Sequence, residues 1–259
     1  MRIHIPTGEG PFAAIIFQHG FVLRYQLYER LLDHLASHGF VVVAPTMYDT
    51  GGLPFGTPSV AEEAQTAAQL SAWVQEQLEP LAGVPVDMDS LGIAGHSRGG
   101  KVAWTLALAE STFAAIAGVD PVDGTGGSPG MDGNEPRLID GSFDLGVPTF
   151  ILGTGLGPQG GALSCSPEGD NYVQFWEASA APAWKVVATE YGHMDMLDRA
   201  ACGLVCGFCQ TGPDIEAMTD ASAGMLVAFF RASLQGDETA YGLLEDPRSA
   251  PIAVEVESK

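Results

Sequence analysis

A glycine-flanked serine between a predicted strand and a predicted helix constrains this chain more than any other feature. The segment Ser90–Lys101 has the sequence SLGIAGHSRGGK, in which Gly95, Ser97 and Gly99 match the pattern G-x-S-x-G. Such a turn needs small residues two positions before and two after the serine, because strand and helix approach closely there. The pattern predicts a reactive Ser97 at the tip of a sharp turn; a glycine-rich turn without chemistry is the simpler alternative.

Strands and helices alternate along the chain, which predicts a mostly parallel sheet with right-handed crossovers and helices on both faces. Continuous apolar runs such as Phe40–Ala44 suit strands that are covered on both sides. The predicted strands are Ala13–Gln18, Phe40–Ala44, Leu91–Ala94, Ala114–Val119, Thr149–Gly153 and Trp184–Ala188. The predicted helices are Tyr25–His38, Val60–Leu78, Lys101–Ala109 and Ile215–Leu234. This order of elements is that of the α/β-hydrolase fold.

No internal repeat or linker divides the chain, so we expect one domain, residues 1–259, with a flexible tail after about residue 246. The formal charge of −21, from 11 basic and 32 acidic residues, argues against a nucleic acid partner. No apolar run is long enough to predict a membrane span, and the first residues lack the pattern of a signal peptide.

The four cysteines, Cys165, Cys202, Cys206 and Cys209, are open to more than one interpretation. The last three form a C-x3-C-x2-C array, but the sequence offers no fourth metal ligand at a typical spacing. Buried thiols or one disulfide are therefore favoured over a metal site, and the spacing does not give the pairing.

A serine hydroxyl is a poor nucleophile, so it needs a base and an acid that orients the base. In α/β-hydrolases the order is serine, acid, histidine. Of the six histidines only His193 follows Ser97, just past the last predicted strand, and it is the candidate base. The loop after Thr149–Gly153, where the acid commonly lies, contains none. Asp120 and Asp123 remain as candidates, and Asp120 is favoured because it comes directly off a strand.

The reaction also needs two backbone N–H groups that stabilise the oxyanion. One is expected from Arg98, the residue after the nucleophile. The other is expected from Phe21, which follows His19-Gly20 at the end of the first long predicted strand.

Several segments resemble the chlorophyllase family of α/β-hydrolases. They are Gln18–Phe21 (QHGF), Ala36–Pro45 (ASHGFVVVAP), Gly95–Lys101 (GHSRGGK), Gly118–Gly124 (GVDPVDG), Gly153–Gly157 (GTGLG) and Tyr191–Asp198 (YGHMDMLD). The resemblance implies cleavage of the phytyl ester of chlorophyll to chlorophyllide and phytol, without a metal or an organic cofactor. It assigns the catalytic triad to Ser97, Asp120 and His193.

The resemblance also implies an oxygenic phototroph as the source, and the chloroplast or the cytoplasm as the compartment. The expected partner is a small-molecule phytyl ester, reached through transient contact with pigment-bearing membranes. The loops 49–58 and 121–147 contain apolar residues and are expected to flank a wide apolar cleft.

Two alternatives stand beside this interpretation. One is an esterase of the same fold that acts on lipids or polyesters. The other is a relative that binds a chlorin or a lipid without turnover, but such a module has no need to keep both Ser97 and His193.

Overall fold

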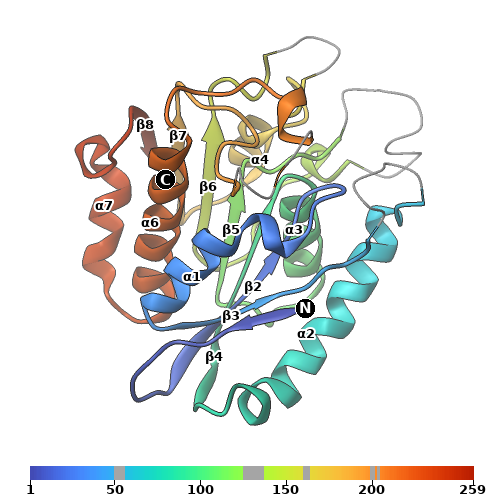
Figure 1. Ribbon diagram of the computed structural model, residues 1–259, viewed down its shortest axis with the longest axis vertical. Helices are drawn as coiled ribbons and strands as arrows, with labels where there is room; N and C mark the ends of the chain where they lie inside the picture. The colour runs from blue at the N-terminus through green and yellow to red at the C-terminus, as the bar shows by residue number, and fades with distance from the viewer. Residues whose placement is uncertain (50–55, 125–136, 160–163, 199–201, 203–204) are drawn as a thin grey trace.

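The computed structural model describes residues 1–49, 56–124, 137–159, 164–198, 202 and 205–259 (Figure 1). The central parts of the two loops expected to flank a cleft, including Leu53, Phe55 and Met131, lie outside these ranges.

Within the described residues, eight strands form a single sheet in the order β1-β3-β2-β4-β5-β6-β7-β8. The six inner strands run parallel, and the two edge strands, β1 and β8, pair antiparallel with β3 and β7. The strands are β1 (Arg2–His4), β2 (Phe12–Gln18), β3 (Phe40–Ala44), β4 (Val86–His96), β5 (Ala115–Val119), β6 (Thr149–Thr154), β7 (Ala183–Ala188) and β8 (Val254–Ser258).

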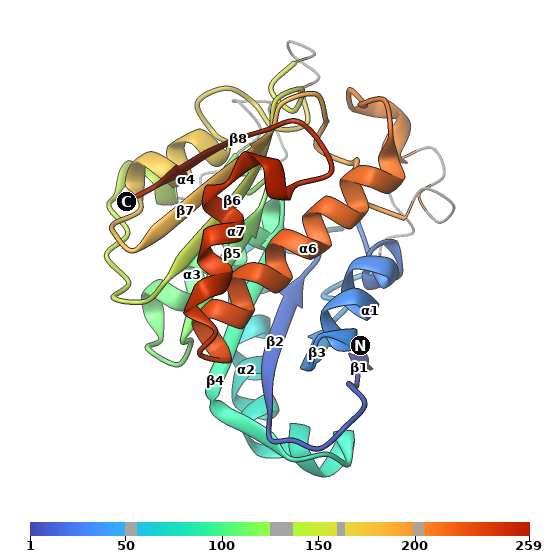
Figure 2. The same cartoon turned by 90° about the vertical axis from the view of Figure 1, so that its left-hand side faces the viewer.

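Helices cover both faces of the sheet, with α1 and α6 on one face and α2, α3 and α4 on the other (Figure 1). Figure 2 views the molecule from the side of α6, against which the short α7 packs. The helices are α1 (Glu29–Ser37), α2 (Val60–Ala82), α3 (Arg98–Ala109), α4 (Tyr172–Ala178), α6 (Ile215–Leu234) and α7 (Tyr241–Glu245). Short 3-10 turns are η1 (Tyr25–Leu27), η2 (Leu138–Asp140), η4 (Val205–Phe208), η5 (Glu238–Ala240) and η6 (Pro247–Ser249).

The apolar strands supply two cores, one on each face of the sheet. In β2, Ile15 and Phe17 pack with α1 and α6, while Ala14 and Ile16 pack with α2 and α3. All five residues of β3 are buried. Successive side chains of a strand point to opposite faces, so a strand between two helical layers must be apolar throughout. This is why unbroken apolar runs predict the inner strands correctly.

The predicted α/β-hydrolase architecture is confirmed, with differences at the start of the first helix and at the edge strands of the sheet. The segment predicted as one helix from Tyr25 begins instead with η1, and α1 starts at Glu29. The three residues of β1 are too few to show periodicity in the sequence.

The structure corrects the expectation of a flexible tail after about residue 246. Val254–Ser258 forms β8 and pairs with β7 along its whole length. Val254 and Val256 pack against the core on the α6 face, and they alternate with exposed Glu255 and Glu257. This alternation over five residues is the pattern of a half-buried edge strand.

The structure also resolves the cysteine question, with two disulfides instead of one. Cys165 pairs with Cys209, and Cys202 pairs with Cys206. All four sulfurs are therefore in covalent bonds and not held as metal-binding thiolates. Within the described ranges, no helix is both long and apolar enough to cross a lipid bilayer.

The packing of β8 leads to a stability prediction. We expect Val256→Asp to lower the free energy of unfolding by about 1–3 kcal/mol, because it places a charge against the apolar core. Glu255→Gln, on the other face of the same strand, should stay within about 0.5 kcal/mol of the parent protein. Thermal and chemical unfolding measure both values. If the two variants are equally stable, β8 does not contribute to the fold as described.

Candidate active site

The residues after several parallel strands form the candidate active site, at the carboxyl ends of these strands. Phe21 follows β2, Ser97 follows β4, Asp120 follows β5 and His193 follows β7. Thr154 is the last residue of β6. Parallel strands place their carboxyl ends together, so residues that are far apart in the sequence meet there.

The turn at Ser97 has the strained backbone that the sequence pattern predicts. Ser97 has a φ of 56°, in a region that residues with a side chain rarely adopt. A Cβ at Gly95 would clash with the backbone of Gly99, and a Cβ at Gly99 would clash with the carbonyl groups of Gln18 and His19. Glycine is therefore required at both positions by the close packing of β2, β4 and α3.

The structure brings Ser97, His193 and Asp120 into one hydrogen-bonded row. His193 Nε2 lies 2.8 Å from Ser97 Oγ, and His193 Nδ1 lies 2.6 Å from Asp120 Oδ2. An ionised carboxylate only accepts, so Nδ1–H donates to Asp120 and leaves Nε2 to accept the Ser97 hydroxyl proton. All three side chains are buried. This arrangement lets a histidine take a proton from a serine while a carboxylate stabilises the resulting imidazolium.

Asp120 is held from the neighbouring strand β6. Thr154 donates its backbone N–H to Oδ1 at 3.1 Å and its hydroxyl to Oδ2 at 2.8 Å. Asp120 has a φ of 43°, so its backbone is strained like that of Ser97. The end of β6, where the sequence contains no acid, thus provides two hydrogen bonds to the acid that follows β5.

Asp123, the other candidate acid, has different partners. Its Oδ1 lies 3.1 Å from Lys101 Nζ, and both groups are buried. Its carboxylate also accepts the backbone N–H groups of Leu138 and Ile139. These contacts tie the loop after β5 to α3 and η2, and they leave Asp123 in a structural position.

The loop after β2 presents the N–H group of Phe21. The N–H groups on either side are occupied, since Gly20 donates to Tyr28 Oη and Val22 donates to Tyr48 Oη, both at 3.0 Å. Among the described residues, the N–H of Phe21 has no acceptor. Val22 is β-branched and has a φ of 53°, so the loop is strained beside this donor.

The two residues whose backbone N–H groups are the predicted oxyanion donors, Arg98 and Phe21, are in contact through their side chains. The Arg98 guanidinium lies 5.3 Å from the centre of the Phe21 ring, a cation–π contact. The same guanidinium forms a buried ion pair with Glu63 of α2 and donates to the carbonyl of Pro58. Arg98 is also the first residue of α3, where backbone N–H groups lack partners within the helix.

A directed chain of hydrogen bonds connects the loop after β2 with the His193 loop. A carbonyl oxygen only accepts, so His96 Nε2–H donates to the carbonyl of His193 at 2.8 Å. In neutral His96 the other nitrogen, Nδ1, then accepts the Tyr28 hydroxyl proton at 2.8 Å. Tyr28 Oη in turn accepts the N–H of Gly20. Burial lowers the pKa of His96 well below its ordinary value, with a further contribution from His193, so this imidazole stays neutral.

Asp195 holds the turn that carries His193. Its carboxylate accepts the backbone N–H groups of Gly192 and Gly212, both at 2.7 Å, and the Thr211 hydroxyl at 2.7 Å. The segment before α6 is thereby fixed to the His193 loop.

The sequence patterns did not point to several residues that support the site. They are Tyr28, Glu63, Thr154 and Asp195, together with His96 as a hydrogen-bonding partner. Most of their contacts join distant segments, and apart from His96 none of them belongs to the G-x-S-x-G pattern. Only the position of His96 beside Ser97 in the G-x-S-x-G pattern could have drawn attention to it.

Fold and site together define the chain as an α/β-hydrolase with a serine, histidine and aspartate arranged for acyl transfer. A solved structure with the same fold is the ferulic acid esterase from Streptomyces cinnamoneus. It has a TM-score of 0.69 and 19% sequence identity, and the match covers 97% of this chain and 75% of that chain.

Sequence comparison identifies the family. A profile of the Chlorophyllase family matches residues 1–259. Chlorophyllase-1, chloroplastic, from Citrus sinensis is 36% identical, and the match covers 96% of this chain and 77% of that protein. Chlorophyllase-2 from Arabidopsis thaliana is 31% identical over 99% of this chain and 84% of that protein. The chain belongs to the chlorophyllase family, and it is a carboxylic ester hydrolase of that type.

The buried His96 leads to a prediction about acid stability. The unfolded chain binds a proton at this histidine near pH 6.5, whereas the folded chain does not, so stability falls as the pH drops below that value. In His96→Gln this contribution is absent, while the glutamine amide can still donate to the His193 carbonyl. We expect the free energy of unfolding of the variant to decrease less between pH 7.5 and pH 5.5.

Chemical denaturation at several pH values measures this difference. Burial also lowers the pKa of His19 and of His34, so part of the pH dependence remains in the variant. An equal decrease in the parent and in His96→Gln would contradict the assignment of a neutral His96.

Proposed function

We propose that the chain hydrolyses the phytyl ester of chlorophyll with Ser97 as nucleophile, His193 as general base and Asp120 as the orienting acid. The backbone N–H groups of Phe21 and Arg98 form the oxyanion hole. The single observation that supports this proposal best is the buried row in which His193 Nδ1 lies 2.6 Å from Asp120 Oδ2 and His193 Nε2 lies 2.8 Å from Ser97 Oγ.

In the first half of the reaction, His193 Nε2 takes the hydroxyl proton as Ser97 Oγ attacks the ester carbonyl carbon. The tetrahedral oxyanion accepts hydrogen bonds from Phe21 and Arg98. When the intermediate collapses, the bond to the phytyl oxygen breaks and His193 returns the proton to that oxygen. Phytol leaves, and the chlorin acid remains as an ester of Ser97.

In the second half, water replaces phytol. His193 takes a proton from the water molecule as its oxygen attacks the acyl carbon, and the same two N–H groups stabilise the second oxyanion. Collapse breaks the bond to Ser97 Oγ, which regains its proton from His193. Chlorophyllide is released, and water is the only other reactant consumed.

The strained backbone near the site supports this assignment. Among the described residues, the non-glycine positions with positive φ are Val22, Ser97 and Asp120. They flank or provide the oxyanion donor, the nucleophile and the acid. Strained conformations of this kind concentrate at functional sites, where the surrounding structure holds them.

The names of the relatives suggest where the protein works. Two relatives, from Citrus sinensis and Citrus unshiu, are named "Chlorophyllase-1, chloroplastic". We therefore propose the chloroplast of an oxygenic phototroph as the compartment and a membrane-derived pigment as the substrate source.

Replacement of the nucleophile tests the mechanism. We expect Ser97→Ala to fold like the parent protein and to lose several orders of magnitude in chlorophyllide release, because no other group can form the acyl-enzyme. Chlorophyll is incubated with each protein, and chlorophyllide is quantified by chromatography. A fluorophosphonate should label the parent at Ser97 and leave the variant unlabelled.

Two further results distinguish the substrate from the mechanism. Near-normal chlorophyllide release by Ser97→Ala would overturn the mechanism. Hydrolysis of a short p-nitrophenyl ester without release of chlorophyllide would keep the mechanism and overturn the substrate.

A comparison of the two aspartates tests the acid. We expect Asp120→Asn to reduce kcat roughly a thousandfold or more, because the imidazole loses its orienting carboxylate. Asp123→Asn is the matched control and should reduce kcat much less, although it weakens the buried contact with Lys101 and lowers stability. Rates are measured below the unfolding temperature of both variants. An active Asp120→Asn beside a folded but inactive Asp123→Asn would show the assignment to be wrong.

A further inference from the structure

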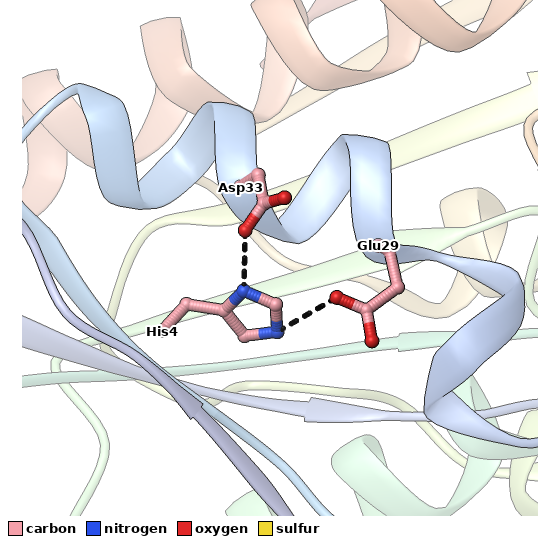
Figure 3. Close-up of side chains that lie close together, drawn as sticks. All are labelled: His4, Glu29 and Asp33. Carbon is pink, nitrogen blue, oxygen red and sulfur yellow. Dashed lines mark hydrogen bonds and ion pairs between the residues drawn. The ribbon is translucent and has the colours of Figure 1, made fainter.

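The first strand and the first helix bring three metal-ligating side chains together at the edge of the sheet, as Figure 3 shows. His4 is the last residue of β1, and Glu29 and Asp33 belong to α1. The two acids are four residues apart, so they lie on the same face of the helix and both point toward β1. In the strand order, β3 and β2 separate this group from β4, which leads to Ser97.

Asp33 determines how the His4 ring is oriented. His4 Nδ1 lies 2.7 Å from Asp33 Oδ1. An ionised carboxylate only accepts, so the proton is on Nδ1 and, in the neutral ring, Nε2 carries the free lone pair. A carboxylate in this position is the usual outer partner of a histidine that binds a metal through its other nitrogen.

The second ring nitrogen is buried and lacks a hydrogen bond. His4 is 4% exposed, and Nε2 has no hydrogen-bonding partner in the described part of the chain. The nitrogen points toward Glu29 Oε2 at 3.9 Å (Figure 3). This distance exceeds the length of an N–H···O hydrogen bond, so protonation of the ring does not satisfy Nε2 either. Two groups that carry lone pairs therefore face each other.

The distance of 3.9 Å between His4 Nε2 and Glu29 Oε2 suits a bridging cation better than a hydrogen bond. Zinc binds imidazole nitrogen at about 2.0–2.1 Å and carboxylate oxygen at about 2.0–2.2 Å, so two ligands of one ion lie within about 4.2 Å of each other. The ideal tetrahedral spacing is about 3.4 Å, which needs a shift of about half an ångström. The Glu29 side chain is 36% exposed, so it has the freedom to make that shift.

We propose that His4 Nε2 and Glu29 bind a divalent transition metal ion of the zinc class, with Asp33 as the outer carboxylate that holds the ring. Water completes the coordination on the exposed side of Glu29. Imidazole favours zinc, nickel and copper over magnesium and calcium, which prefer sites built of oxygen atoms alone. The ion joins β1 to the first turn of α1 and takes no part in ester hydrolysis.

Zinc titration of the full chain tests this proposal, after half-buried His34 and exposed His38 have been replaced. These rings lie 4.5 Å apart at positions i and i+4, a spacing at which histidines also bind zinc. We therefore use His34→Gln/His38→Gln as the parent for all measurements. The protein is freed of metal with a chelator, and zinc chloride is added in a calorimeter.

We expect one zinc equivalent to bind to this parent. At a zinc concentration of a hundred times Kd, the melting temperature should rise by about 5–10 °C. Magnesium chloride should produce no comparable rise. Glu29→Gln should weaken zinc binding at least tenfold because it removes a direct ligand. Asp33→Asn should weaken it about 10–100-fold because it removes the outer carboxylate.

Glu76→Gln serves as the matched control, since Glu76 is an exposed glutamate of α2, far along the chain from His4. Its zinc affinity should equal that of the parent. Circular dichroism confirms that each variant is folded before titration. Equal zinc affinity in Glu29→Gln and the parent, or no zinc binding at all, would overturn the proposal. In the second case, a loss of stability in metal-free Glu29→Gln would identify an ion pair with protonated His4 as the alternative.

Discussion

The close approach of β2, β4 and α3 around Ser97 is the constraint on which the rest of the site depends. The backbone atoms at Gly95 and Gly99 are so near their neighbours that a single Cβ would force the layers apart. Because α3 can start directly after the serine, its first N–H groups lie beside Ser97. The positive φ of Ser97 is stable only because a sheet and a helix hold the turn from both sides.

Two polar networks then fix the loops that surround this turn. Tyr28 and His96 connect Gly20, beside the proposed oxyanion donor, with the carbonyl of His193. Arg98 provides the other proposed donor, and its side chain pairs with Glu63 and lies over the ring of Phe21. Buried polar groups are stable only when they are paired, so each network tolerates one arrangement of its members. We infer that Tyr28 and His96 are positioning residues, which fix the loop of His193, the proposed base, relative to the loop of Phe21, the proposed oxyanion donor.

The two aspartates after β5 show how position in the fold separates residues that the sequence presents as alternatives. Asp120 meets His193 and Thr154 at the sheet edge, whereas Asp123 pairs with Lys101 and holds the loop. Asp123 lies three residues further from the end of β5 than Asp120. This difference is enough for its carboxylate to contact Lys101 and not His193. The His4 group lies apart from this site, on the outermost strand β1 and on α1, and strands β3 and β2 lie between β1 and β4.

The sequence by itself determined the fold and the candidate nucleophile and base, Ser97 and His193, and it limited the candidate acid to Asp120 or Asp123, because these follow from local patterns. Apolar runs predict buried strands, small residues around Ser97 predict the turn, and the order of residues restricts the base to His193. Only the tertiary structure decided that Thr154 holds Asp120, that His96 joins Tyr28 to the His193 loop, and that the four cysteines form two pairs. It also placed β8 on the sheet. These contacts join segments far apart in the chain, and their partners are chosen by the packing of the whole fold and not by any local spacing.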